Sequence, residues 1–374
     1  MKKFLALLLA LVMSLSLVAC GGGDDTAADG GADAEDGGNA ETAAYQVAMI
    51  TDYGDITDQS FNQTTYEACQ EFCDAEGLQF EYYKPAGDST AERVAMVDAA
   101  VADGYNVIVM PGYAFAETIK ETAELYPDVT FIALDVAQGD LGEDYTVPSN
   151  VYCAVYQEEL CGYMAGYAAV KLGYTHLGVL GGMAVPAVQR FGYGFVQGAD
   201  AAAKEIGATD VNIKYWYSGG FAATDEVKNK MDGWYSEGTE VVFACGGPVC
   251  QSCDAAAQAN GGKMIGVDVD QSGQFDTVIT SAMKGLAESV NEALTDAMNN
   301  GWKFSETYSG KETKLGAAEN CVGLPMSTSK FTKFTQEQYD SMYASIVDGT
   351  LTIDDSYDAD VKPAVTTITV DYQS

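Results

Sequence analysis

The stretch YQVAMITDYGDITDQSFNQTTYEACQEFCDAEGLQFEYYK, residues 45–84, decides the fold of this chain. Its apolar residues predict a strand over 45–50, a helix over 59–75 and a second strand over 78–84. The alternation continues with a helix over 89–102, a strand over 107–110, a helix over 114–126 and a strand over 130–134. Such a strand–helix–strand succession predicts a parallel sheet with helices on both faces and a ligand site at the carboxyl ends of its strands.

A second α/β series follows an irregular stretch at residues 136–150. We expect helices over 156–171, 188–206, 222–235 and 251–259, and strands over 176–180, 211–217, 241–244 and 263–267. A strand at 277–281 and a helix at 282–299 indicate that the chain crosses back into the first lobe, which would form a hinged cleft. Lobe 1 is expected to comprise approximately residues 45–150 plus 280–305, and lobe 2 approximately residues 151–279 plus 306–374.

The N-terminus predicts export and a lipid anchor. Lys2 and Lys3 precede an apolar run at residues 4–18, and small residues follow at a cleavage point, so residues 1–19 form a signal peptide. The run is shorter than the ~20 apolar residues of a membrane-spanning helix. Its end, LVAC, resembles the lipobox of bacterial lipoproteins, which implies that Cys20 carries the lipid. We therefore expect a cell-membrane location, lipid-anchored, on the extracytoplasmic face.

Composition divides the rest of the chain into a tether and a folded region. Residues 20–44 are rich in Gly, Ala and Asp and lack large apolar side chains, so they predict a flexible acidic linker. Residues 45–374 form the expected substrate-binding region. The formal charge of the 374-residue chain is -36, which excludes nucleic acid as a partner because phosphate binding needs clustered Lys and Arg.

The cysteines and the single histidine provide little support for metal or catalytic chemistry. Cys245, Cys250 and Cys253 have the spacing C-x4-C-x2-C, but no fourth soft ligand is evident nearby, so we expect no metal site. The other cysteines suit disulfides or buried thiols equally well. His176 is the only histidine and falls in a predicted strand, so the usual histidine-based catalytic arrangements are missing. We therefore expect no enzyme activity.

Residues 51–63, TDYGDITDQSFNQ, resemble the opening motif of the basic membrane protein family, the purine nucleoside receptor group of ABC-transporter substrate-binding lipoproteins. Further blocks resemble the family in the expected order, at residues 131–135, 150–152, 181–183, 246–247 and 265–271. The resemblance covers most of the chain from Val47 to about Leu286. It implies a type I periplasmic-binding-protein fold, with two doubly wound lobes joined by a hinge, a nucleoside between them and no cofactor.

Four matched residues are candidates for contacts with the base, and three of them lie early in the chain. Asp52 follows the first strand, where a carboxylate can accept from a base amino or imino group or cap the next loop. Phe61 and Phe191 resemble the family's two aromatic walls, although either could be plain core. Asn62 could read a base edge or a ribose hydroxyl, or cap the helix start.

The other candidates lie at later strand ends. Asp135 follows a strand and resembles a base-contacting aspartate, and Asp268 could accept from both ribose hydroxyls, with Asp270 as the competing residue. Lys284 resembles the family's lysine near the ribose, or is a solvated lysine at a helix start. Gly246 would let backbone N–H groups approach the ligand, although the neighbouring Cys-rich sequence departs from the family pattern.

These features predict an extracytoplasmic binding lipoprotein of an ABC importer that captures a purine nucleoside. The chain contains neither a phosphate-loop motif nor a further long apolar run, so ABC permease and ATPase subunits are expected as partners. A sugar or autoinducer receptor on the same fold is the alternative, because aromatic walls with aspartates also suit pyranoses. A nucleoside hydrolase that uses Asp268 and Asp270 is the weaker one.

Overall fold

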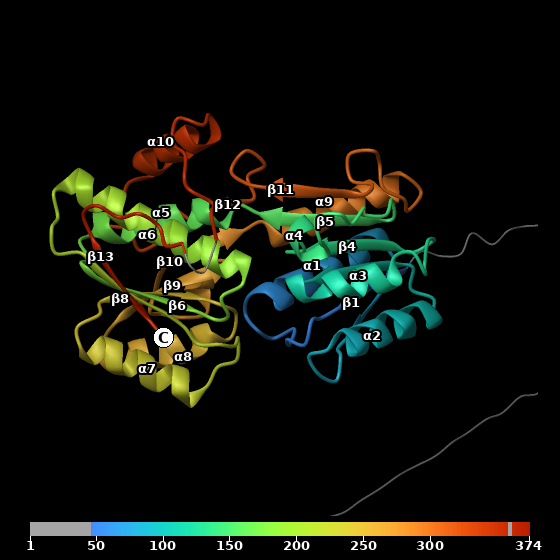
Figure 1. Cartoon of the computed structure of the whole chain (residues 1–374), viewed down its shortest axis with the longest axis horizontal. Helices are drawn as coiled ribbons and strands as arrows, with labels where there is room; N and C mark the ends of the chain where they lie inside the picture. Colours follow the sequence, from blue (N-terminus) through green and yellow to red (C-terminus); the bar gives the residue numbers. More distant parts are fainter. Residues whose placement is uncertain (1–45, 358–360) are drawn as a thin grey trace, which may run out of the picture. The chain divides into compact units, whose positions relative to one another are not determined.

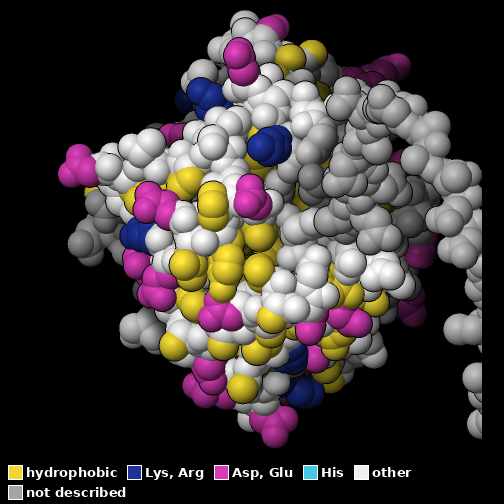
Figure 2. Space-filling view, turned by 90° about the vertical axis from the view of Figure 1, so that its right-hand side faces the viewer, with side chains coloured by type: hydrophobic (Ala, Val, Ile, Leu, Met, Phe, Trp, Pro, Cys, Tyr) yellow, Lys and Arg dark blue, Asp and Glu magenta, His cyan; other side chains and the backbone are white. Residues whose placement is uncertain are grey.

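Two parallel sheets form the framework of the part of the chain that the structure, a computed structural model, describes: residues 46–357 and 361–374 (Figure 1). The expected signal peptide, lipidated Cys20 and acidic linker lie outside the described residues. Among the described helices, none combines the length and the apolar character needed to cross a membrane. On the face shown in Figure 2, acidic side chains are more frequent than Lys and Arg side chains.

The first sheet has the strand order β11-β5-β4-β3-β1-β2, and all of its pairings are parallel. Its strands are β1 (Gln46–Ile50), β2 (Gln79–Tyr83), β3 (Val107–Pro111), β4 (Thr130–Leu134), β5 (Val151–Tyr156) and β11 (Lys311–Leu315). Its helices are α1 (Phe61–Glu76), α2 (Thr90–Ala102), α3 (Ala116–Thr122), α4 (Gln138–Leu141) and α9 (Leu286–Asn299), with a 3-10 turn η1 (Tyr113–Phe115).

Both faces of the first sheet are covered, as the alternation of its strand residues requires. Val47 and Met49 of β1 pack in one cluster with α1 and α9, whereas Ala48 and Ile50 pack in another with α2 and α3. Burial on both faces explains why this strand is a continuous apolar run without polar alternation. The same arrangement leaves the carboxyl ends of the strands as the edge from which polar loops emerge.

The second sheet has the order β12-β10-β9-β8-β6-β7-β13 and is parallel except for β12, which pairs antiparallel with β10. Its strands are β6 (His176–Gly181), β7 (Asn212–Tyr217), β8 (Val241–Cys245), β9 (Lys263–Asp268), β10 (Val278–Lys284), β12 (Val322–Gly323) and β13 (Thr369–Gln373). Its helices are α5 (Glu158–Leu172), α6 (Pro186–Ile206), α7 (Asp225–Ser236), α8 (Val249–Asn260) and α10 (Gln336–Val347), with a 3-10 turn η2 (Gln271–Gly273).

Helices α5 and α6 approach each other unusually closely through glycines. A Cβ at Gly162 would lie 2.2 Å from the carbonyl oxygen of Phe191, and one at Gly194 would lie 2.1 Å from the carbonyl oxygen of Glu159. Any larger residue would therefore force the two backbones apart. This packing fixes the part of α6 that carries Phe191 against the start of α5.

The strand pairings correct the lobe boundaries expected from the sequence. β5 and β11 belong to the first sheet, although the sequence pattern places both in lobe 2, and all of β10 belongs to the second sheet. The helices expected to start at residues 156 and 282 start at 158 and 286, because the preceding residues complete β5 and β10. Sheet membership depends on hydrogen bonds between strands distant in sequence, which local periodicity does not report. The chain crosses between the sheets after β5, β10 and β11.

Candidate functional site

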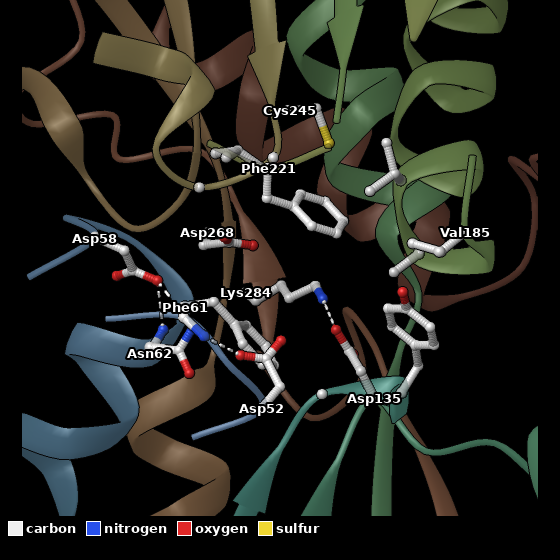
Figure 3. A pocket seen from close by; sticks show the side chains of 18 of the residues that line it. Asp52, Asp58, Phe61, Asn62, Asp135, Val185, Phe221, Cys245, Asp268 and Lys284 are labelled. Atoms are coloured by element: carbon white, nitrogen blue, oxygen red, sulfur yellow. Dashed lines mark hydrogen bonds and ion pairs between the residues drawn. The ribbon is translucent and has the colours of Figure 1, made fainter. Parts of the chain in front are cut away.

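A cavity of about 320 Å³ lies where the carboxyl ends of strands from both sheets face each other (Figure 3). The loops after β1, β3 and β4 contribute one side, and the loops after β6, β7 and β8 with the ends of β9 and β10 contribute the other. The structure brings all eight residues predicted from the sequence to this cavity: Asp52, Phe61, Asn62, Asp135, Phe191, Gly246, Asp268 and Lys284.

Lys284 is the central cation of the cavity. Its side chain is 2% exposed, and its Nζ lies 2.6 Å from Asp135 Oδ2 and 3.0 Å from Glu158 Oε1. Figure 3 shows its side chain reaching across the cavity floor toward Asp135. Burial lowers the pKa of Lys284, but Asp135, Glu158 and Asp268 outweigh burial and raise this pKa above its ordinary value. The alternative of a solvated lysine is therefore wrong.

Aromatic rings surround the same ammonium group. The Nζ of Lys284 lies 5.1 Å from the ring centroid of Phe61, 5.0 Å from that of Tyr156 and 5.5 Å from that of Phe191. Each distance is within the range of a cation–π contact. Phe61 and Phe191 thus line the cavity from opposite lobes, with a fixed cation beside both rings.

Glu158 and Arg190 extend the charged network around Lys284. Arg190 Nε donates to Glu158 Oε2 at 2.6 Å, and the Glu158 side chain is fully buried. Burial alone would raise the pKa of Glu158, but Arg190 and Lys284 lower it below its ordinary value. Reasoning from the sequence did not select either residue for the site, although two acids at the start of α5 and an arginine in the apolar helix α6 were visible signals.

Asp135 and Asp268 both end a strand in a strained backbone conformation. Their φ angles are +59° and +66°, in the left-handed region that side chains rarely adopt. Burial raises the pKa of Asp268 to about 6, despite the opposing effects of Lys284 and Ser60. Burial also raises the pKa of Asp135, with Lys284 opposing it. Two buried aspartates in this backbone conformation, one at a strand end of each sheet, are typical of a functional site.

Asp270, the competing residue, lies away from the cavity. Its Oδ1 accepts from the backbone N–H of Ser272 at the start of η2, and its Oδ2 accepts from Thr328 Oγ1 at 2.5 Å. Asp270 is not among the described residues that line the cavity. Of the two aspartates, only Asp268 is therefore placed to meet a ligand.

Asp52 and Asn62 lie on the side of the cavity formed by the first sheet. The Oδ1 of Asp52 accepts from the backbone N–H groups of Tyr53 and Gly54 at 2.7 and 2.8 Å, so the residue caps its loop and lines the cavity at once. Burial raises the pKa of Asp52. Asn62 Nδ2 donates to Asp58 Oδ2 at 3.2 Å, whereas its Oδ1 is buried without a partner. The Asn62 side chain therefore leaves an acceptor available to the cavity.

Gly246 lies at a tight crossing of backbones after β8. Its φ is +150°, and a Cβ there would lie 2.9 Å from the backbone nitrogen of Gly182. The neighbouring Cys245 and Phe221 also face the cavity (Figure 3), and no periodic pattern in the sequence indicated Phe221. The departure from the family pattern thus places a buried thiol beside the glycine rather than blocking the strand end.

The cysteines of the C-x4-C-x2-C spacing are buried free thiols. Burial raises the pKa of Cys245, and it raises those of Cys250 and Cys253 to about 12. Within residues 46–357 and 361–374, no group of three or more His, Cys, Asp or Glu side chains is arranged to hold a metal ion. Protonated, buried thiols of this kind act as small apolar groups.

Comparison with known proteins places the chain in a family. Residues 45–356 match the model of the PnrA-like ABC transporter substrate-binding proteins. The CD4+ T-cell-stimulating antigen of Listeria innocua is 25% identical over 94% of this chain and 98% of its own length. The ABC transporter nucleoside-binding protein BmpA of Lactococcus lactis is 25% identical over 82% of this chain and 88% of its own.

A solved structure agrees with the architecture. An ABC transporter solute-binding protein from Aeropyrum pernix has a TM-score of 0.70 and 21% identity, over 84% of this chain and 95% of that protein. Together with the two parallel sheets, this likeness shows the type I periplasmic-binding-protein fold that the sequence predicted. On the match over residues 45–356, the chain belongs to the PnrA-like family of ABC transporter substrate-binding proteins.

Proposed function

We propose that this substrate-binding protein captures a purine nucleoside in the cavity between its two sheets. The observation that carries the proposal is a pair of buried oxygen acceptors that have no hydrogen-bond donor and belong to the same cavity as two aromatic rings. Asn62 Oδ1 and Asp135 Oδ1 are buried without a hydrogen-bond partner, and Phe61 and Phe191 line the same cavity. Unpaired buried acceptors cost free energy until a ligand supplies donors. A flat base with N–H groups, attached to a ring with hydroxyls, supplies both donors and stacking surface.

The charges of the cavity favour a nucleoside over a nucleotide. Six aspartates and three cationic side chains are among the described lining residues, and Lys284 is already engaged by Asp135 and Glu158. A phosphate group would therefore meet net negative charge without a free cation to pair with it. We expect phosphorylation of the sugar to abolish binding.

Calorimetry with adenosine, guanosine, inosine, cytidine, ribose and AMP tests this proposal. We expect micromolar or tighter binding of at least one purine nucleoside, about -8 kcal/mol or better. Asp268→Ala should abolish the binding, because Asp268 lies at the cavity, whereas the matched control Asp270→Ala should leave it unchanged. Binding of ribose without any nucleoside would instead support the sugar receptor.

We also propose that the cavity binds without catalysis. No histidine is among its described lining residues, and Asp270 is turned away from Asp268, so the carboxylate pair of a hydrolase is not assembled. Incubation with inosine should release no free hypoxanthine. Release at roughly 1 per second or faster, an enzyme-like rate, would overturn this part of the proposal.

The remaining parts of the proposal concern the membrane. We infer that Cys20 carries the lipid, that the acidic linker tethers the protein to the extracytoplasmic face, and that the lobes close on ligand before docking on an ABC permease driven by ATPase subunits. The lipobox-like end of the apolar run supports the lipid. Mass spectrometry of the purified N-terminus tests it, and Cys20→Ala should release the protein from the membrane fraction.

A further inference from the structure

Helix α1 is capped by Asp58 instead of by its own N-cap residue, Ser60. Asp58 Oδ2 accepts from the backbone N–H of Asn62 at 2.9 Å, and its Oδ1 accepts from those of Ser60 and Gln63 at 2.9 and 3.0 Å. A serine at this position ordinarily accepts from the second or third N–H of its helix, but Ser60 makes no such bond. The hydroxyl of Ser60 is therefore free to serve another partner.

That partner lies on the other sheet. Ser60 Oγ donates to Asp268 Oδ2 at 2.5 Å, across 208 positions of sequence, and both residues are buried. Ser60 belongs to the start of α1, beside the first sheet, whereas Asp268 ends β9 of the second. The bond occupies one oxygen of the aspartate and holds its carboxylate in place. The other oxygen remains available to the cavity.

A second hydrogen bond joins the two sides next to the first. Gln271 Nε2 donates to the carbonyl oxygen of Gln59 at 3.0 Å, and Gln59 has a left-handed φ of +59°. Gln271 is fully buried and is fixed within its own lobe, because its Oε1 accepts from the N–H of Val267 and its N–H donates to Ser281 Oγ, both at 3.1 Å. The second lobe thus presents a donor that is already fixed in position, Gln271 Nε2, to the backbone carbonyl of Gln59 in the first lobe.

We propose that Ser60 and Gln271 form a closure latch, which holds the two lobes together and positions Asp268 for the ligand. Neither residue is among the described lining residues of the cavity, so each acts as a positioning residue. The role of the latch in ligand release rests on the proposed function, since it requires Asp268 to contact the bound molecule. The role of the latch in lobe closure does not rest on the proposed function. Opening the cleft breaks both bonds and frees the carboxylate of Asp268.

Ser60→Ala tests the first bond, and Ser89→Ala is its matched control. Ser89 is the N-cap of α2 in the same lobe, where its Oγ accepts from the N–H of Glu92. Ser60→Ala should speed the release of inosine by roughly tenfold or more, as expected for the loss of a hydrogen bond to a charged group. Helix α1 should keep its cap, because Asp58 supplies it. Ser89→Ala should lower the thermal midpoint and leave inosine release unchanged.

Gln271→Glu tests the second bond and keeps one contact within the lobe. An ionised glutamate keeps an oxygen for the N–H of Val267 but lacks the donors to the Gln59 carbonyl and to Cys250 Sγ. We expect faster inosine release in stopped-flow fluorescence. Gln258→Glu is the control, because Gln258 donates only within α8, to Asp254. Release rates for Ser60→Ala and Gln271→Glu that equal those of their controls would overturn the latch.

Small-angle scattering of the ligand-free protein separates the latch from the proposed function. Ser60→Ala and Gln271→Glu should increase the radius of gyration relative to the wild type and to Ser89→Ala, because the lobes open. An unchanged radius in both variants overturns the latch whether or not any nucleoside binds. Failure of the wild type to bind every nucleoside overturns the proposed function alone, and the scattering still decides the latch.

Discussion

Two neighbouring glutamates at the start of α5, Glu158 and Glu159, are equally buried and yet have opposite electrostatic character. Glu158 pairs with Arg190 and Lys284, which line the ligand cavity and hold the pKa of Glu158 below the ordinary value. Glu159 borders a second cavity of about 360 Å³ beside the segments that follow β5 and β11, and its Oε2 has no partner. Burial and the charge of Glu158 raise the pKa of Glu159 to about 7. Partners, and not depth, determine whether a buried carboxylate stabilises its surroundings.

Neutralising Glu158 should have the largest effect on stability. Glu158→Gln should lower the free energy of unfolding at pH 7 by roughly 3–5 kcal/mol, because Arg190 and Lys284 lose a buried counter-charge. Urea unfolding measures the change. Glu205→Gln is the control, since Glu205 pairs with Lys171 at the surface, and it should give a much smaller loss. Equal losses in the two variants would contradict the buried network.

Glu159→Gln should change the free energy of unfolding in the opposite direction to Glu158→Gln. A folded-state pKa of about 7 means that the folded protein binds the proton of Glu159 more tightly than the unfolded chain does. This difference costs stability as the pH rises from the unfolded value of about 4.5 to about 7, and the cost is then constant. Glu159→Gln should therefore stabilise the protein at pH 8 by up to about 3 kcal/mol and have little effect at pH 4. Destabilisation at pH 8 would show that Glu159 has an essential charged partner.

The pH dependence of ligand affinity should come from Asp268 in the ligand cavity and not from Glu159 at the second cavity. The pKa of Asp268 is about 6, and we propose that its ionised form accepts ligand hydroxyls, so nucleoside affinity should fall roughly tenfold between pH 7 and pH 5. Calorimetry at the two pH values measures the fall. Glu159→Gln should retain it, since Glu159 is not among the described residues that line the ligand cavity. A pH dependence lost in Glu159→Gln would assign the proton to the second cavity.

Much of the fold was predictable because strands buried on both faces leave continuous apolar runs. The runs at β1, β3 and β4 were each found from local periodicity. β5 was not found, because its residues, VYCAVY, lead directly into the apolar helix α5 and the two runs merge. β11, KETKL, was also missed, because an edge strand with charged residues has no apolar signal. Sequence alone could not say which sheet each of these strands joins.

The candidate site also contains residues that could be predicted from the sequence and residues that could not. Strand ends in a parallel sheet converge, so Asp52, Asp135 and Asp268 could be selected by their positions after apolar runs. The partners Glu158 and Arg190 could not, because an ion pair is a matter of distance in space and the two residues lie 32 positions apart in the sequence. Asp135 and Lys284 lie 149 positions apart, so local sequence patterns contain no information about their contact.

Short-range periodicity and chain direction are enough to predict the alternation of strands and helices and the polar residues at strand ends. Only the packing of distant segments shows which charges pair, which of Asp268 and Asp270 faces the cavity, and that Ser60 reaches across to Asp268 instead of capping its helix. Hydrogen bonds and ion pairs act over about 3 Å, and local sequence patterns do not set distances between segments far apart in the chain.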